Sequence, residues 1–169
     1  SIALKISKVP MLFVGSLGLV LIPQLASSFH QNELEKFNGL ILKSLNFVIT
    51  FSLPVIFFIF GISEELLYAF AGEQFVGAGL TLKILSVVVL LIGLSNVFGL
   101  QILTPMGKDK FLTFSVLLGT ITSLSLNFIL IPLYQEKGAA ITNIITELVV
   151  TGATLYFASK FIKLDFDSL

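Results

Sequence analysis

The sequence contains no cysteine and no arginine. The absence of cysteine excludes disulfide frameworks, thiolate zinc sites and cysteine nucleophiles together. Without arginine, no side chain can bind a phosphate or a carboxylate in the planar, bidentate manner. Any anion must then be bound by lysine ammonium groups or by helix termini. We predict no metal site and no cofactor for this chain.

Charged residues are also scarce, at 12% of the 169 residues, about half of the usual fraction of roughly 25%. Ten lysines balance ten acidic residues, so the formal net charge is zero and no basic field exists that would attract nucleic acid. Hydrophobic residues make up 56% of the chain and the mean hydropathy is +1.02. This composition is typical of a membrane protein and excludes nucleic acid as a partner.

Long apolar runs predict the fold class. Five of them are long enough to cross a membrane, at about 9–29, 40–60, 81–104, 111–132 and 138–159. We therefore expect an all-α protein, a polytopic transmembrane helix bundle that forms a single domain over residues 1–169. Transporters are commonly built from paired repeats, so an odd number of spans favours a fragment. Its partners would include missing N-terminal helices of the same protein.

Residues 126–150 predict a transmembrane hairpin with an acid inside its second arm. The first arm is apolar and ends at Pro132, a short polar turn follows, and small residues open the second arm, which contains Glu147. An acid at this depth costs about 2.5–3.5 kcal/mol on insertion scales, so another group should hold it. One interpretation is a cavity carboxylate that binds a coupling proton or cation, or pairs with a lysine. The other is a structural acid that is kept neutral or hydrogen-bonded to Asn or Thr of a neighbouring helix.

Amides and hydroxyls on the apolar helices are the other candidates for a cavity. Helical spacing places two sets of them on one face each. They either line a hydrated path or form interhelical hydrogen bonds worth under about 1 kcal/mol each. The amide candidates are Asn96, Gln101, Asn127 and Asn143, and the two stripes are Thr113, Thr120, Ser123 and Asn127, and Asn143, Glu147, Thr151 and Thr154.

Lysines near the helix ends predict the orientation. One side of the predicted bundle holds Lys36, Lys43, Lys108, Lys110, Lys160 and Lys163, and the other holds Lys5, Lys8, Lys83 and Lys137. The positive-inside rule then places the C-terminus in the cytoplasm and the acidic segment 62–79 outside, along the lipid headgroups. The polar segment 27–38 is expected to be a solvated connection between the first two spans.

Four segments, taken in order, resemble a known family. They are Pro23 at the end of a span, AFAGEQFVGAGLTLKIL at 69–85, QILTPMGKDK at 101–110 and LNFILIPLYQEKGAAITNIITELV at 126–149. Together they resemble the C-terminal part of polysaccharide and O-antigen flippases, the Wzx-like members of the multidrug/oligosaccharidyl-lipid/polysaccharide exporter superfamily. The resemblance covers nearly the whole chain. It implies the C-terminal lobe of a MATE-like transporter, whose two lobes surround a central cavity.

The resemblance also implies a task and a location. Such proteins move an undecaprenyl-diphosphate-linked glycan across the bacterial cytoplasmic membrane by alternating access, so lipid-linked oligosaccharide and membrane lipids are the expected partners. Lys5, Lys8 and Lys83 are the plausible cavity-side cations for the diphosphate. The alternative for these lysines is snorkelling to the membrane interface.

Other functions predict other features. A cation-coupled multidrug exporter of the same fold would favour an acid-rich cavity lined by aromatic side chains. A membrane enzyme would need a sizeable loop with Asp, His or Arg for its chemistry, and the longest predicted loop has one histidine and two glutamates without the spacing of a catalytic or metal site. We therefore predict that the chain is not an enzyme. A purely structural subunit would have no continuous polar path between its helices.

Overall fold

The computed structural model describes residues 18, 20–73 and 78–162. These residues form helices joined by short turns, and the described part contains no strand. Residues 20–30 are helical, and the elements that follow are α2 (Leu34–Ala71), α3 (Gly79–Asn96), the π-helix η2 (Val97–Leu103) and α4 (Asp109–Phe161). Three helical segments, Leu34–Phe70, Gly79–Leu103 and Asp109–Phe161, are long and apolar enough to cross a membrane. The predicted all-α transmembrane bundle is confirmed.

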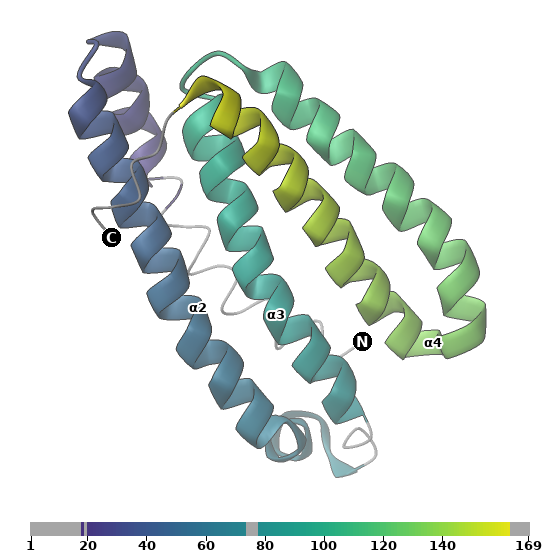
Figure 1. The fold of residues 1–169 in the computed structure, drawn as a ribbon. Helices are drawn as coiled ribbons and strands as arrows, with labels where there is room; N and C mark the ends of the chain where they lie inside the picture. Colours follow the sequence, from purple (N-terminus) through teal and green to yellow (C-terminus); the bar gives the residue numbers. More distant parts are fainter. Residues whose placement is uncertain (1–17, 19, 74–77, 163–169) are drawn as a thin grey trace.

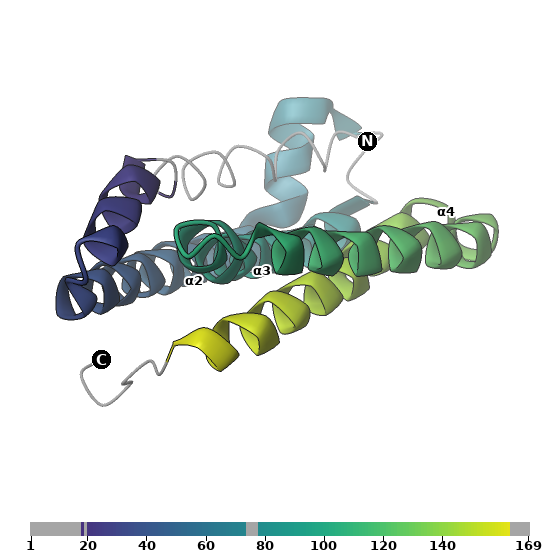
Figure 2. The ribbon, with the colours of Figure 1, turned by 90° about the horizontal axis from the view of Figure 1, so that it is seen from above.

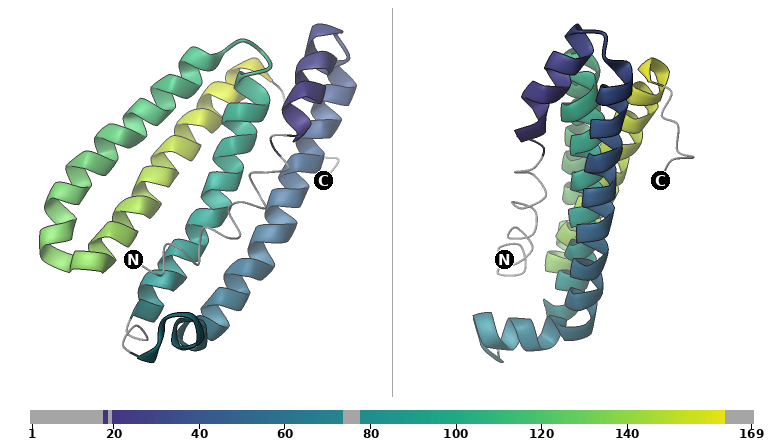
Figure 3. Two further views of the ribbon diagram at one scale, coloured as in Figure 1. Left: turned by 180° about the vertical axis from the view of Figure 1, so that it is seen from behind. Right: turned by 90° about the vertical axis from the view of Figure 1, so that its left-hand side faces the viewer.

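Two breaks divide the long helices. α4 has a non-helical residue at Gln135, with φ 49° and ψ −120°, and beyond it the chain returns antiparallel to its first half (Figure 1). Each arm, 109–134 and 136–161, is about 39 Å long at 1.5 Å per residue, enough for a hydrocarbon core of about 30 Å. The first arm continues through Pro132 to the bend. α2 breaks at Ile62, and its last turns run across the end of the bundle (Figure 3).

The helices are arranged around one layer. α2, α3 and the first arm of α4 lie side by side, the second arm of α4 lies on one face, and the helix that ends at His30 lies on the other (Figure 2). The first half of the predicted span at 9–29 falls outside the described residues, and residues 20–29 are helical as predicted. The predicted polar connection at 27–38 is too long, because only residues 31–33 lie outside helices. Phe37 explains this, since it is 1% exposed and packs its turn of α2 into the core.

The turns lie at two ends of the bundle. The turn at 31–33, the 104–108 turn and the C-terminal end of α4 are at one end, and the end of α2, the start of α3 and the Gln135 bend are at the other (Figure 1). This arrangement groups Lys36, Lys108, Lys110 and Lys160 at one end and Lys83 and Lys137 at the other. The grouping matches the one used to predict the orientation. The cytoplasmic position of the C-terminus stays a prediction, as does the position of segment 62–79 along the headgroups.

Packing in the core joins the helices in two clusters. The larger includes Leu25, Phe37, Ile41, Val97 and Ile102 and ties the helix at 20–30 to α2 and η2. The smaller joins α2 and α3 to the second arm of α4 near the opposite end. Large apolar side chains elsewhere point outward, such as Phe128 at 81% exposure. This is expected where lipid is the solvent, because helix association in lipid depends on close packing and hydrogen bonds.

One buried hydrogen bond connects α4 to α3. Thr151 Oγ1 donates to the Leu91 carbonyl oxygen at 3.0 Å. Of the two roles predicted for the polar stripe, Thr151 therefore has the interhelical hydrogen bond. Thr154, also on that stripe, is fully buried and donates to Val150 and Thr151 carbonyls of its own helix.

Replacing Thr151 by valine removes this bond while keeping the shape of the side chain. We expect a loss of about 0.6 kcal/mol, the mean for interhelical hydrogen bonds in a membrane, measured by reversible unfolding in mixed micelles. Thr113→Val is the control, because Thr113 Oγ1 donates to Asp109 of its own helix and is exposed. Equal losses in the two variants would contradict the role given to the Thr151 bond.

Candidate functional site

Glu147 lies in a groove between α3 and both arms of α4. The groove has a volume of about 450 Å³, within the range of roughly 300–1,000 Å³ typical of small-molecule sites. We call it the Glu147 groove. It is lined by Ile92, Ser95 and Asn96 of α3, by Val116, Gly119, Thr120, Ser123 and Leu124 of the first arm, and by Thr146, Glu147 and Val150 of the second.

Helical periodicity explains how the first arm contributes its wall. Its five lining residues are spaced by three, one, three and one positions, which places them on a single helical face. Gly119 on this face lets the two arms approach, because a Cβ at this position would overlap the Val150 side chain. The groove is therefore bounded on one side by a close contact between the arms.

Three polar side chains in the groove have unused hydrogen-bonding capacity. In the described part of the chain, no hydrogen bond or ion pair joins the half-buried Glu147 carboxylate to another residue, and the same is true of the Asn96 amide. The Thr146 hydroxyl is buried and has no partner among residues 18, 20–73 and 78–162. Unpaired buried polar groups are costly, which makes this groove a place where a polar ligand or a cation would be stabilised.

Hydroxyls on the other two walls of the groove, formed by α3 and the first arm of α4, donate to carbonyls of their own helices. Ser95 Oγ donates to the Ile92 carbonyl at 3.0 Å and Thr120 Oγ1 to the Val116 carbonyl at 2.9 Å. A hydroxyl oxygen that donates in this way keeps lone pairs that can accept. Together the groove offers one carboxylate, one amide and several hydroxyl oxygens, a set suited to sugar hydroxyls or to a single cation.

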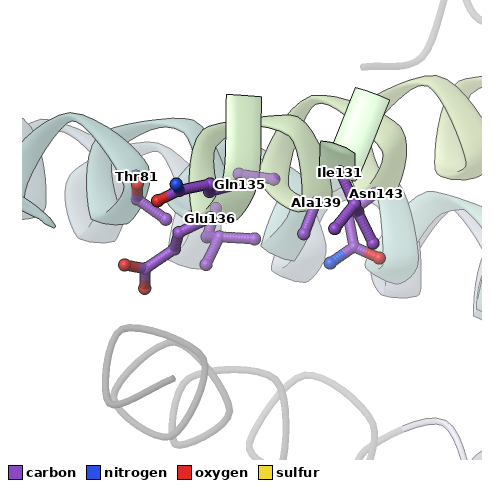
Figure 4. Close-up of a pocket in the computed structure, with 8 residues that line it drawn as sticks. Thr81, Ile131, Gln135, Glu136, Ala139 and Asn143 are labelled. Atoms are coloured by element: carbon purple, nitrogen blue, oxygen red, sulfur yellow. The ribbon is translucent and has the colours of Figure 1, made fainter. Parts of the chain in front are cut away.

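Asn143 occupies a different cavity, although it precedes Glu147 by one helical turn. This cavity, of about 410 Å³, lies beside the bend and is lined by Thr81, Leu85, Ile131, Gln135, Glu136, Ala139, Ala140 and Asn143. Figure 4 shows Thr81, Gln135 and Glu136 near one another beside the turn of α4, with Asn143 farther along the second arm. The predicted stripe is thus divided among three places. Asn143 lines the cavity beside the bend, which we call the bend cavity, Glu147 lines the Glu147 groove, and Thr151 and Thr154 are packed in the interior.

The remaining amide candidates are placed apart from the groove lining. Asn127 donates to Ser123 Oγ at 3.3 Å on the first arm, so it contacts a residue that does line the groove. Gln101 is 2% exposed in η2, its amide nitrogen lies 3.0 Å from where a Cβ on Gly18 would sit, and its Oε1 has no partner among the described residues.

Of the three lysines predicted for the cavity, the structure describes only Lys83. Lys5 and Lys8 lie outside the described residues. Lys83 is half-buried near the start of α3 and lines none of the three cavities found in the part of the chain that the structure describes. The described residues that line the Glu147 groove are therefore one acid and otherwise uncharged side chains.

Several groove residues could not be chosen from the sequence. The sequence pattern does not point to Thr146 or to Gly119. Thr120 and Ser123 were recognised as part of a polar stripe, which was the right signal. Periodicity assigns a residue to a face of its helix, whereas the neighbouring helix that this face meets is decided by tertiary packing.

Comparison with known proteins adds a relative. No protein-family model matches the chain, and no solved structure is significantly similar to it. The chain is 37% identical over 86 residues to a protein of Escherichia coli (strain K12) described as "Putative O-antigen transporter". The matched stretch is 51% of this chain and 21% of that protein. The predicted relationship to O-antigen flippases is thereby confirmed, over about half of this membrane-spanning chain.

Proposed function

We propose that the protein is a lipid-linked oligosaccharide flippase for polysaccharide biosynthesis. The observation that carries the proposal is the similarity to a protein described as an O-antigen transporter. The Glu147 groove supports it, because a polar lining within apolar helices is what a sugar needs to cross hydrocarbon. Since the matched stretch is 21% of that relative, transport is proposed for the complete gene product.

The proposed substrate is an undecaprenyl-diphosphate-linked glycan in the bacterial cytoplasmic membrane. The hydroxyls and the amide of the groove would contact sugar hydroxyls, and Glu147 would bind a coupling proton or cation during the cycle. A groove of about 450 Å³ accommodates only part of such a molecule. Further helices of the same protein would then complete the cavity, and the C-terminus would face the cytoplasm.

The two other classes have less support. A multidrug exporter would favour several acids and aromatic walls, whereas the Glu147 groove contains one carboxylate and none of the described residues that line it is aromatic. An enzyme would need a constellation of acid, base or nucleophile side chains, and Glu147 is the single ionisable group among the described residues that line the groove. We therefore propose transport without catalysis.

A strain that lacks the gene tests the proposal. We expect it to lose surface polysaccharide and to accumulate the lipid-linked glycan in the cytoplasmic leaflet, measured by its protection from an externally added glycan-modifying enzyme. Expression of the complete gene should restore both. Normal surface polysaccharide combined with increased sensitivity to cationic drugs would reject the flippase and favour the exporter.

A further inference from the structure

Three lysines surround one aromatic cluster where the two ends of α4 meet. Lys108 Nζ lies 4.9 Å from the ring centroid of Phe161, Lys110 Nζ 5.3 Å from that of Phe111, and Lys160 Nζ 4.3 Å from that of Tyr156. These distances are within the limit of about 6 Å for a cation–π contact. We call the group the lysine–aromatic cluster.

Ring contacts hold this cluster together across the hairpin. Phe111 packs against Phe157 and Phe161 at centroid distances of 4.9 and 5.4 Å, and Tyr156 packs against Phe157 at 5.4 Å. The rings belong to both arms of α4, so the three ammonium groups are carried by a shared rigid surface. They lie at the end of the bundle that also holds the 104–108 turn (Figure 1).

These positive charges are not paired within the described residues, where the ion pair found is Lys36–Glu33 at 2.9 Å. Helix stability does not account for them either. Lys160 lies in the last turn of α4, where a cation is favourable, but Lys108 and Lys110 lie at its N-terminus, where the helix dipole opposes a cation. An anion outside the described structure would compensate all three.

An exposed apolar stripe begins beside the cluster. Phe114 contacts Phe157 at a centroid distance of 6.0 Å and is followed at helical spacing by Leu117 and Ile121. These three side chains are 52%, 53% and 57% exposed. A ligand with an anionic head and apolar chains would match both features at once, because its head would meet the lysines while its chains follow the stripe.

We propose that the lysine–aromatic cluster binds the phosphate headgroup of an anionic phospholipid, in the leaflet on the side of the 104–108 turn. The apolar stripe distinguishes this occupant from free phosphate. The site is separate from the Glu147 groove and does not depend on the proposed transport function. Its ligand is a lipid of the surrounding bilayer.

The test compares two lipids that share the same acyl chains. Phosphatidylglycerol and phosphatidylcholine are titrated into the detergent-solubilised complete gene product, and bound lipid is counted by native mass spectrometry. Juxtamembrane lysines contribute enough that each Lys→Gln change should weaken phosphatidylglycerol binding about fivefold, and K108Q/K110Q/K160Q together roughly 100-fold. Binding of phosphatidylcholine should not change, and the triple Lys→Arg variant should retain the affinity for phosphatidylglycerol.

Two matched controls carry the same loss of charge. Lys36 is at the same end of the bundle but is paired with Glu33, and Lys137 is at the bend. K36Q and K137Q should each change phosphatidylglycerol binding by less than about twofold, since Lys36 is already neutralised and distant charges are screened. Helical content by circular dichroism verifies that each variant is folded, and single variants replace the triple one if it is not.

Three results would overturn the proposal. The first is unchanged phosphatidylglycerol binding in the folded Lys→Gln variants, and the second is an equal loss of phosphatidylcholine. The third is displacement of phosphatidylglycerol by inorganic phosphate, or by a polyprenyl diphosphate at lower concentration, which would assign the lysines to a free anion or to the transported lipid.

Discussion

Replacement of Glu147 by glutamine is expected to reduce export of the lipid-linked glycan about tenfold to 100-fold. Glutamine keeps the size of the side chain but removes its charge and replaces one acceptor oxygen by an NH2 donor. Interactions with a charged group contribute about 1.5–3 kcal/mol, and each 1.4 kcal/mol corresponds to about tenfold. Export would be measured as restoration of surface polysaccharide in the deletion strain, with the amount of membrane-inserted protein determined in parallel.

Glu136→Gln is the matched control for this prediction. Glu136 is an exposed carboxylate of the same arm and lines the cavity beside the bend, outside the Glu147 groove. Its replacement should leave export unchanged. If Glu147→Gln exports normally, or if both variants lose export to the same degree, Glu147 has no specific part in transport and the structural interpretation of this acid is the correct one.

Replacement of Gly138 by alanine should destabilise the hairpin by about 1–3 kcal/mol, the usual cost of forcing an extra methyl group into a packed site. A Cβ at this position would overlap the Leu130 carbonyl oxygen and lie 2.7 Å from the Leu130 carbonyl carbon. Both are backbone atoms across the bend, so no side-chain rotation can relieve the overlap. Reversible unfolding in mixed micelles would measure the loss.

Gly152→Ala provides the comparison on the same arm. Nothing lies within 4 Å of a Cβ at Gly152, and alanine is the better helix former by up to about 1 kcal/mol. This variant should be as stable as the parent or slightly more stable. Similar behaviour of the two alanine variants would show that the two sides of the bend are less closely packed at Gly138 than the structure indicates.

The hairpin illustrates how far the sequence predicts this fold. Apolar runs on both sides of a polar turn were sufficient to predict two antiparallel arms. The exact bend was not predictable, because Gln135 adopts φ 49°, a conformation that favours glycine or asparagine over glutamine. Pro132 was expected to end the first arm, yet the helix continues past it. The position of the bend is imposed by packing across it, as at Gly138.

The candidate site was partly predictable for a similar reason. A lone carboxylate in an apolar helix is conspicuous from composition alone, and so is an amide such as Asn96. Which polar faces meet was not predictable, because the period of a helix carries no information about its neighbours. Asn143 and Glu147 share a face but line different cavities, and Thr151 on that face bonds to α3 instead.

The two arms of α4 are fastened to each other at both extremities. Backbone contact at Gly138 joins them beside the bend, and contacts between the tilted rings of Phe111, Phe157 and Phe161 join them at the opposite end. Because the two arms are in contact near both ends, they cannot separate at one end without breaking the contacts there. The space around Glu147 is therefore expected to widen by sliding or tilting of α3 relative to the α4 hairpin. Such a movement would break the hydrogen bond between Thr151 and Leu91.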